Sequence, residues 1–389
     1  MNILKDAPVA VHSCESYDTD EVYAVLCRCF ADAGIGETQI KGKKVVIKPN
    51  LVMAKKPELA ATSHPATVEA CAKLLSELGA AKITLADSPG GPFSAPALSM
   101  VYKTCGMAPL EGTYGISLNS DCTFQNVFFK DGSSLKNFNI IRAAEEADVL
   151  LNLCKLKTHS LTGMSCAVKN VFGVIPGVEK FEMHATFSTV DSFSAMLNDL
   201  NAYLLSEKTY LSVCDGIIGM EGNGPTHGVP KKAGLMLVST SPFALDIVAE
   251  HIIGCDGEVK YLDIAAERGY VSRDVREINA VGKKDYPVYQ FQKPDNAAGK
   301  FLRNLPNFMG GRFAPLFEAR PEIDTKKCVG CGVCVRSCPK HTIALTNTKK
   351  GKKTAAITRT NCIKCYCCQE LCPAGAVKTK QNPLIKLIH

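Results

Sequence analysis

The 389-residue sequence contains no tryptophan, and aromatic residues make up only 7% of it. No stretch approaches the roughly 18 uncharged apolar residues of a membrane-spanning helix, so we predict no membrane span. The first twenty residues lack the apolar run and the small-residue cleavage site of a signal peptide. These absences predict a soluble, cytoplasmic protein, and 46% hydrophobic residues are enough for ordinary globular cores.

Signatures of several large enzyme classes are also missing. The sequence has no GxGxxG fingerprint, no Walker A loop, no HExxH zinc motif and no GxSxG turn. The common dinucleotide-binding, nucleotide-hydrolysing, zinc-protease and serine-hydrolase classes are therefore not predicted, and no flavin signature is evident.

Strand-like and helix-like segments alternate through most of the chain. The strand-like segments are 43–49, 81–91, 147–159, 209–216 and 233–240, and the helix-like segments are 64–79 and 242–254. Continuous apolar strands that alternate with helices predict an α/β fold with a largely parallel sheet flanked by helices.

This alternation stops near residue 284. Residues 287–322 are rich in Pro, Gly and Asn, which predicts a linker that packs over the body. The expected organisation is an α/β body over 1–286 with a ligand site, the linker over 287–322, and a small α+β domain over 323–389.

Nineteen cysteines are present, and nine of them fall between Cys328 and Cys372. In a reducing compartment, clustered cysteines indicate metal ligands rather than disulfides. The other ten are scattered in apolar surroundings, which is typical of buried thiols that pack as small hydrophobic groups.

Two cysteine runs share the spacing CxxCxxCxxxCP. This spacing resembles that of bacterial two-[4Fe-4S] ferredoxins over residues 323–381, in which the fourth cysteine of each run ligates the other cluster. A pair of zinc sites is the alternative, but zinc ribbons usually separate two CxxC pairs by a long spacer. The predicted ligands are Cys328, Cys331, Cys334 and Cys372 for cluster one, and Cys362, Cys365, Cys368 and Cys338 for cluster two.

Cys367 breaks the three-residue step of the second run. We expect its side chain to point away from the cluster-binding face, as a packed or hydrogen-bonding thiol.

The C-terminal segment is basic, with 13 Lys/Arg against 3 Asp/Glu from residue 321 onward. The lysines of residues 349–353 form either a solvated turn or a docking patch for an acidic electron carrier of the ferredoxin or flavodoxin type. Nucleic acid is not a predicted partner, because no aromatic residues interleave with the lysines.

Polar segments follow four of the predicted strands, at 48–51, 87–91, 155–170 and 219–225. Since ligands of open α/β sheets bind at the carboxyl ends of the strands, we expect a cationic pocket for a small anionic substrate or cofactor there. An Asp-capped turn at 87–91 and a solvated lysine face are the simpler alternatives. The candidate catalytic residues are Lys169, His159 and Asp87. The candidate ligand-binding residues are Lys155, Lys157, Asn170, Glu221, Asn223 and Asn50.

The segments KPNLV, SHPATVEA, DSPGG, KLKTHSLTGMSCAVKNVFGVIPG, GMEGNGP and SPFALDIVA resemble the motif series of the domain-of-unknown-function 362 family over residues 40–255. Members of that family often carry a C-terminal ferredoxin module. The resemblance implies an architecture and a site, but no particular reaction.

A second resemblance is to nickel-pincer lactate racemases, carried by His159, Lys169, the Pro-Gly pair at 176–177 and His184. In those enzymes the lysine anchors the pincer cofactor and a histidine binds nickel. Here Ala167-Val168 replace the Gly-Gly before that lysine, and the substrate arginine has no counterpart. No nickel pincer is predicted.

The leading hypothesis is an oxidoreductase in which two [4Fe-4S] clusters relay electrons to the cationic site, where His159 delivers protons. Clusters transfer single electrons and most organic reductions need two, so an additional cofactor in the body is expected. The alternative is a non-catalytic ferredoxin-type carrier, or a cofactor-maturation or assembly protein, that docks to another enzyme.

Overall fold

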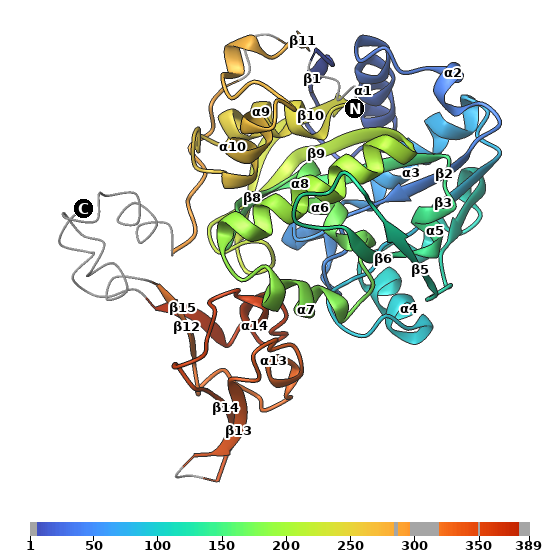
Figure 1. The fold of residues 1–389 in the computed structure, drawn as a ribbon. Coiled ribbons are helices and arrows are strands. Elements are labelled where there is room, and N and C mark those ends of the chain that lie inside the picture. The colour runs from blue at the N-terminus through green and yellow to red at the C-terminus, as the bar shows by residue number, and fades with distance from the viewer. Residues whose placement is uncertain (1–5, 284–286, 296–318, 349–350, 381–389) are drawn as a thin grey trace.

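A mixed, mostly parallel sheet forms the centre of the body (Figure 1). The computed structural model describes residues 6–283, 287–295, 319–348 and 351–380. The strand order is β11-β1-β10-β9-β7-β2-β3-β4, with β8 paired to the end of β7. The strands are β1 (Val9–Ser13), β2 (Lys44–Lys48), β3 (Lys82–Leu85), β4 (Ile116–Leu118), β7 (Val149–His159), β8 (Gly163–Ser165), β9 (Thr209–Glu221), β10 (Val229–Ser239) and β11 (Ala280–Gly282).

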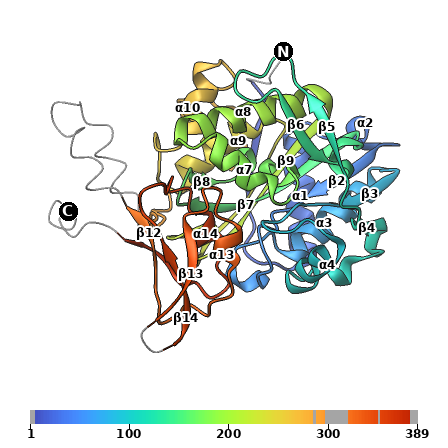
Figure 2. The same cartoon turned by 60° about the horizontal axis from the view of Figure 1, so that its bottom comes forward.

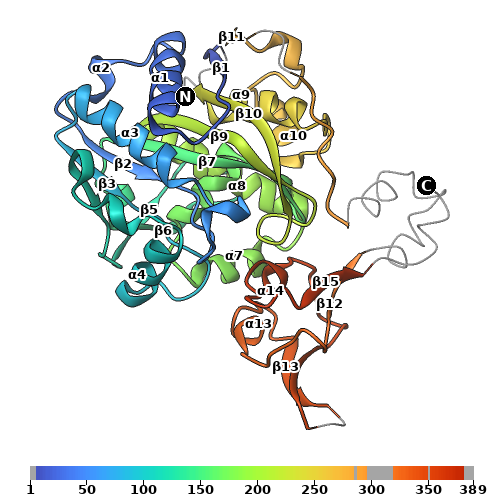
Figure 3. The same cartoon turned by 180° about the vertical axis from the view of Figure 1, so that it is seen from behind.

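Helices cover both faces of this sheet, as Figure 1 and the reverse view in Figure 3 show. Helices α1 and α3 pack in a core on one face, and α8, α9 and α10 pack in a second core on the other. The helices of the body are α1 (Thr19–Asp32), α2 (Glu37–Ile40), α3 (Pro65–Glu77), α4 (Ala95–Thr104), α5 (Arg142–Glu145), α6 (Ala167–Asn170), α7 (Glu179–Thr186), α8 (Val190–Glu207), α9 (Pro242–Ile252) and α10 (Lys260–Glu267).

The predicted α/β class is confirmed, and the central strands show why. Strand β7 is buried along its whole length and is parallel to both of its long neighbours, β2 and β9. A strand covered on both faces needs an unbroken apolar run, which is the pattern that the sequence shows there. Strand β10 runs antiparallel to β9, so residues 222–228 are the loop of a hairpin.

The C-terminal domain is small and built from two short sheets and two short helices (Figure 2). In both Figure 1 and Figure 2, its helix α14 lies next to α7 of the body. The domain comprises β12 (Arg320–Ile323), α13 (Val333–Arg336), β13 (Ile343–Asn347), β14 (Lys353–Ile357), α14 (Cys367–Glu370) and β15 (Val377–Lys380). A separate hairpin on the body pairs β5 (Phe124–Phe128) with β6 (Asn137–Ile141).

The start of the predicted linker lies on the body. Gly222 N donates to Gln292 O over 2.7 Å, and Asn223 Nδ2 donates to Asp295 Oδ2 over 2.7 Å. Residues 296–318 lie outside the described part of the chain, so the linker as a whole and the domain boundaries stay predictions. No helix within the described ranges is long and apolar enough to cross a membrane.

A buried ion pair joins the two central strands. Lys155 Nζ on β7 lies 2.9 Å from Asp215 Oδ2 on β9, and it also donates to Tyr17 Oη over 2.6 Å. Both side chains of the pair are at most 1% exposed. Removing one charge from such a pair leaves the other uncompensated in a low-dielectric interior.

We therefore expect Lys155→Met to lower the free energy of unfolding by roughly 3–5 kcal/mol, measured by urea denaturation of anaerobically purified protein. The double variant Lys155→Met/Asp215→Asn should recover a large part of this loss, because no unpaired charge remains and Asn can still accept from Tyr17. A single variant as stable as the parent protein would contradict the inferred role of this pair.

Candidate functional site

A cavity of about 80 Å³ lies at the carboxyl ends of the central strands. Strands β2 and β7, the loop after β3, and helices α6 and α7 supply its walls from the body, and α14 supplies one wall from the C-terminal domain. The charged residues and histidines that line it are Lys48, Asp87, Lys157, His159, Lys169, Lys180, His184 and Glu370.

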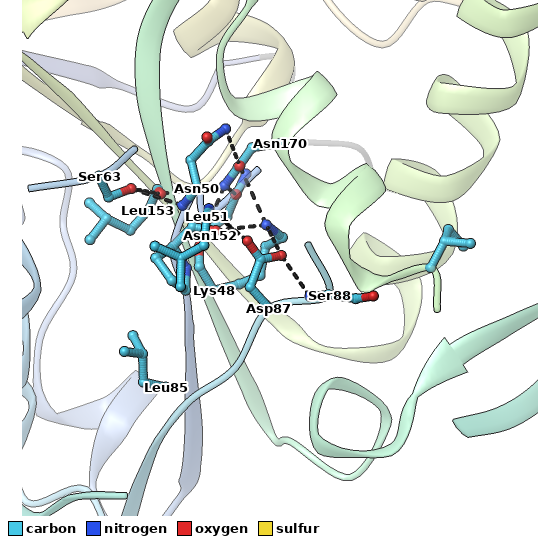
Figure 4. A network of polar contacts seen from close by, with 12 residues as sticks. Lys48, Asn50, Leu51, Ser63, Leu85, Asp87, Ser88, Asn152, Leu153 and Asn170 are labelled. Carbon is cyan, nitrogen blue, oxygen red and sulfur yellow. Dashed lines mark hydrogen bonds and ion pairs between the residues drawn. The ribbon is translucent and has the colours of Figure 1, made fainter. Parts of the chain in front are cut away.

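An ion pair between Lys48 and Asp87 forms the floor of this cavity (Figure 4). Lys48 Nζ lies 2.8 Å from Asp87 Oδ1, and Leu51 N donates to Asp87 Oδ2 over 2.7 Å. Gly173 covers the pair so closely that a Cβ atom there would lie 2.3 Å from Asp87 Oδ1. Because each Asp87 oxygen is already engaged, this carboxylate is suited to holding Lys48 rather than to moving protons.

Three asparagines extend the floor into a hydrogen-bonded network (Figure 4). Asn50 Nδ2 donates to Asn170 Oδ1 over 2.9 Å, and Asn170 Nδ2 donates to Asn152 Oδ1 over 2.7 Å. Asn50 Oδ1 in turn accepts from Lys157 Nζ over 2.9 Å. Each of these hydrogen bonds fixes the orientation of the next amide, and the last amide, that of Asn50, holds Lys157 Nζ in one position.

Three lysines of the cavity have no carboxylate within ion-pair distance among the described residues. Lys157 Nζ donates to carbonyl oxygens, and burial together with the charges of Lys169 and Lys155 lowers its pKa to about 7. Lys180 Nζ donates to Ser88 Oγ, and burial lowers its pKa to about 7 as well. Neither ammonium group is neutralised by its neighbours.

Lys169 differs from the other two because its nearest partners are aromatic rings. Its Nζ lies 4.8 Å from the ring centroid of Phe172 and 5.7 Å from that of Phe193. Burial lowers its pKa, and the nearby Glu370 carboxylate opposes that shift. A cation held by ring faces keeps its N–H groups available to a ligand.

Two histidines face the same space in the neutral state. His159 Nδ1 accepts from the backbone N–H groups of Leu161 and Thr162, so the ring hydrogen is assigned to Nε2. Burial lowers the pKa of His159 to about 4 and that of His184 to about 3. His184 is stacked on Phe193 with ring centroids 4.4 Å apart.

Glu370 brings a carboxylate into the cavity from the C-terminal domain. Its Oε1 lies 3.2 Å from His159 Nε2, and neither atom has another hydrogen-bonding partner among the described residues. Burial on its own raises the pKa of Glu370, but His159, Lys169 and His184 outweigh it and lower the pKa to about 2. The carboxylate is therefore ionised at neutral pH.

Further contacts hold α14 against the body. Thr226 Oγ1 donates to Glu370 O over 2.8 Å, and His227 Nε2 donates to Cys372 O over 3.0 Å. Gly90 leaves room for Leu371, since a Cβ atom at Gly90 would lie 2.6 Å from Leu371 Cδ2. The glycine of the DSPGG segment thus permits close approach of the two domains.

The structure brings together most of the candidate site residues. Lys169, His159, Asp87, Lys157, Asn170 and Asn50 line the cavity. Three others lie outside its lining. Lys155 pairs with Asp215, Glu221 Oε2 accepts from Gln292 N over 2.9 Å, and Asn223 bonds Asp295.

Five charged, histidine or thiol residues of the lining were not among the candidates: Lys48, Lys180, His184, Cys367 and Glu370. Of these, the sequence pointed to His184 only through the resemblance to lactate racemases, and to Lys48 only as part of the polar segment 48–51. Lys180 and His184 are four residues apart on α7, and this spacing on one helix face was an available signal. Glu370 is one of only three acidic residues after position 320, and it lies inside a cysteine run.

Two smaller cavities inside the C-terminal domain are lined by the two predicted sets of cysteines. One contains Cys328, Cys331, Cys334 and Cys372, and the other contains Cys338, Cys362, Cys365 and Cys368. Backbone N–H groups point at the sulfurs of Cys372, Cys338 and Cys328, with N···S distances of 3.2, 3.3 and 3.4 Å. Such N–H···S contacts stabilise anionic thiolates, so the donor sets fit two iron–sulfur clusters.

The loops around these cavities need a left-handed backbone at equivalent places. In the first loop Gly330 and Gly332 have φ of 70° and 73°, whereas in the second Lys364 and Tyr366 have φ of 55° and 63°. Cys367 follows Tyr366 and turns away from the cluster cavity into the lining of the body cavity.

A third group of cysteines lies inside the body. Cys166 Sγ is 3.6 Å from Cys154 Sγ and 3.5 Å from Cys214 Sγ, and all three are buried in the core. Burial raises the pKa of Cys154 and Cys166, which favours their thiol forms, whereas hydrogen bonds from these two thiols lower the pKa of Cys214 to about 6.

Comparison with known proteins assigns both parts of the chain. A family model described as "Domain of unknown function (DUF362)" matches residues 45–251, and one described as "4Fe-4S dicluster domain" matches residues 327–376. The C-terminal domain is therefore an iron–sulfur domain of the ferredoxin type.

Among curated proteins, thylakoid-associated protein sll1697 of Synechocystis is 32% identical over 62% of this chain and 73% of its own length. A heterodisulfide, ferredoxin reductase subunit from Methanothermobacter marburgensis is 34% identical, but the match spans only 19% of this chain and 13% of that protein.

Among solved structures, the lactate racemase apoprotein of Thermoanaerobacterium thermosaccharolyticum aligns with a TM-score of 0.35 and 18% identity, over 54% of this chain and 50% of that one. The first family model spans more than half of this chain, including the central strands β2, β7, β9 and β10. The chain belongs to the DUF362 family and carries a 4Fe-4S dicluster domain at its C-terminal end.

Proposed function

We propose that this iron–sulfur protein is an oxidoreductase that reduces a small anion bound in the cavity between the body and the dicluster domain. One observation carries the proposal: α14, which contains the cluster-lining Cys368, also forms a wall of the lysine-lined cavity. Residues Cys365 and Cys368 flank Cys367, whose side chain faces that cavity. A redox centre and a binding site that share a helix are separated by a short path.

The charge balance of the cavity supports an anionic ligand. Asp87 neutralises Lys48, which leaves Lys157, Lys169 and Lys180 facing the single carboxylate of Glu370. Buried cations without counter-ions are costly, so an anion that enters relieves that cost. A volume of about 80 Å³ suits a small carboxylate or a phosphate-like oxyanion.

The two cysteine sets supply the ligands for two [4Fe-4S] clusters in this proposal, and the clusters would supply single electrons. The protein's own residues bind the anion through lysine N–H groups and exclude water from it. His159 is neutral because burial lowers its pKa to about 4 and its Nδ1 accepts two backbone N–H groups. Its Nε2–H therefore serves as a hydrogen-bond donor that orients the Glu370 carboxylate 3.2 Å away. A two-electron reduction requires a further cofactor or a radical step.

The alternative hypothesis is a non-catalytic electron carrier, or a cofactor-maturation or assembly protein, that docks to another enzyme. In that case the dicluster domain transfers electrons to the partner, and no reaction takes place in the cavity. This alternative would be favoured by a protein whose cavity binds no anion. In either case we propose an acidic one-electron carrier as the redox partner. The free, mostly buried body thiols support a reducing, cytoplasmic setting.

The cluster ligands can be tested by iron and acid-labile sulfide analysis after anaerobic purification. We expect about eight of each per chain. Cys372→Ala should lose about four irons, because it removes a ligand of cluster one, whereas Cys367→Ala should keep all eight. Zinc in place of iron, or equal iron loss in both variants, would overturn the assignment.

The anion site can be tested with sulfate as the probe, by calorimetry. Lys169→Met should weaken sulfate binding by roughly tenfold or more, because it removes a cation and keeps the packing against Phe172 and Phe193. Glu370→Gln should have the opposite effect and tighten binding. Lys103→Met, at an exposed helix position, is the matched control and should bind as the parent protein does.

If Lys169→Met and Lys103→Met bind sulfate equally well, the cavity is not the anion site. The same conclusion would follow if Glu370→Gln weakened binding, since removing a negative charge from a true anion site must favour the anion.

Sulfate affinity should fall as pH rises through 7. With pKa values of about 7, Lys157 and Lys180 are mostly charged near pH 6 and mostly neutral near pH 8. Sulfate keeps its charge over this range, so its Kd should rise by roughly tenfold for each lysine that must be protonated. A Kd that is flat between these pH values would contradict the role of both lysines.

A further inference from the structure

The two halves of the dicluster domain are sequence repeats, and the contacts with the body described above are made by the second half. Each cysteine of the first run recurs 34 positions later, from Cys328 and Cys362 to Cys338 and Cys372. Helix α13 in the first half therefore corresponds to α14 in the second. The face of α14 that carries Cys367 and Glu370 lies against the body, whereas Arg336 on α13 is exposed.

The residues at equivalent positions on the two helices differ in charge. Glu370 on α14 enters the lysine-lined cavity, and the residue at its position on α13 is Arg336, which is exposed. The acidic side chain thus meets a cationic surface within the molecule. Arg336, at the equivalent position of the other half, is exposed and available to bind an anionic surface of another protein.

The loop that precedes α13 exposes a cluster-lining cysteine and an apolar side chain next to it. Val329 is 66% exposed, and Cys331 is exposed, whereas its repeat counterpart Cys365 is partly covered. Electron transfer between proteins requires close approach to a redox centre, and an exposed apolar residue beside a cluster ligand permits that approach. Cluster one is therefore the centre that a second protein can reach.

Positive charges surround this loop. Arg336 Nη1 is 3.5 Å from Cys331 O, and Lys352 Nζ donates to the carbonyl oxygens of Thr325 and Lys326. The backbone of Lys353 lies against Gly330, where a Cβ atom would be 2.7 Å from Lys353 O. All of these cationic residues are exposed.

The two other acidic residues of the domain do not offset this charge. Asp324 Oδ2 lies 2.7 Å from Lys378 Nζ, and Glu322 Oε1 lies 2.9 Å from Lys380 Nζ. Both carboxylates are thus matched by lysines of β15. The charge that remains around the loop before α13 is positive.

We infer that the face formed by residues 326–336 is the surface at which electrons enter, and that it fits a small acidic one-electron carrier protein. The inference rests on the proposed function, in which α14 faces the site where electrons are used. Electrons then cross the domain from the half that carries α13 to the half that carries α14. Opposite charges on carrier and domain steer the encounter and orient it.

The test is the rate of reduction by an acidic flavodoxin in its hydroquinone form, followed anaerobically through its semiquinone colour. The variant combines Lys326→Glu, Arg336→Glu and Lys353→Glu. Its second-order rate constant at low ionic strength should fall by roughly tenfold to a thousandfold, and the decrease of the rate with added salt should flatten.

The matched control places three Glu substitutions on the body, at exposed Lys82, Lys103 and Lys130. This control has the same net charge as the first variant and should keep most of the parent's rate and salt dependence. Proteins are compared at equal iron content and equal rates of reduction by photoreduced deazariboflavin, a small reductant that needs no docking surface.

The inference is overturned if both triple variants lose the same rate, or if neither does. Sulfate binding, measured on the same samples, should be unchanged in the surface variant. Failure of the docking face therefore shows in the flavodoxin rate alone, and failure of the proposed anion site shows in the Lys169→Met titration alone.

Discussion

The arrangement of this protein depends on the burial of lysine side chains at one edge of a parallel sheet. A buried ammonium group loses several kcal/mol of hydration, and each lysine here is stabilised differently. Lys48 and Lys155 have carboxylate partners, Lys157 has carbonyl and amide oxygens, and Lys169 has aromatic faces. The stabilisation becomes less complete toward the cavity. The anion site proposed above therefore depends on the three lysines that lack a carboxylate partner.

The lack of carboxylate partners for the lysines of the cavity explains why the dicluster domain docks there through α14. Two carboxylates line the cavity within the described chain: Asp87, which is paired with Lys48, and Glu370, which comes from the dicluster domain. Docking of that domain supplies a counter-charge and also covers the cavity. Binding energy, redox centre and enclosure therefore come from a single contact, between α14 and the strand ends. A cavity built in this way is complete only when both domains are in place.

The fold could be predicted from the sequence because it depends on the local spacing of apolar residues, and the prediction of the two cysteine ligand sets also rests on local spacing. Apolar runs with the right period located β2, α3, β7 and α9 to within a few residues, and cysteine spacing gave the two sets of four. The sequence does not show which polar partner each lysine side chain contacts. Lys155 and Lys157 are two residues apart on β7, yet one pairs with Asp215 and the other lines the cavity. That division follows from how β7 is paired with β9, where the register shifts between these two residues.

The repeat within the dicluster domain poses a problem of orientation. A domain with two nearly equivalent halves has two candidate faces for docking, related by a half-turn. The half-turned arrangement would place Arg336 among the lysines of the cavity, and desolvated like charges repel strongly. The difference in charge between Glu370 and Arg336 therefore favours one docking orientation of the dicluster domain over the other. This difference lets a pseudo-symmetric redox module sit on an asymmetric body in one preferred way.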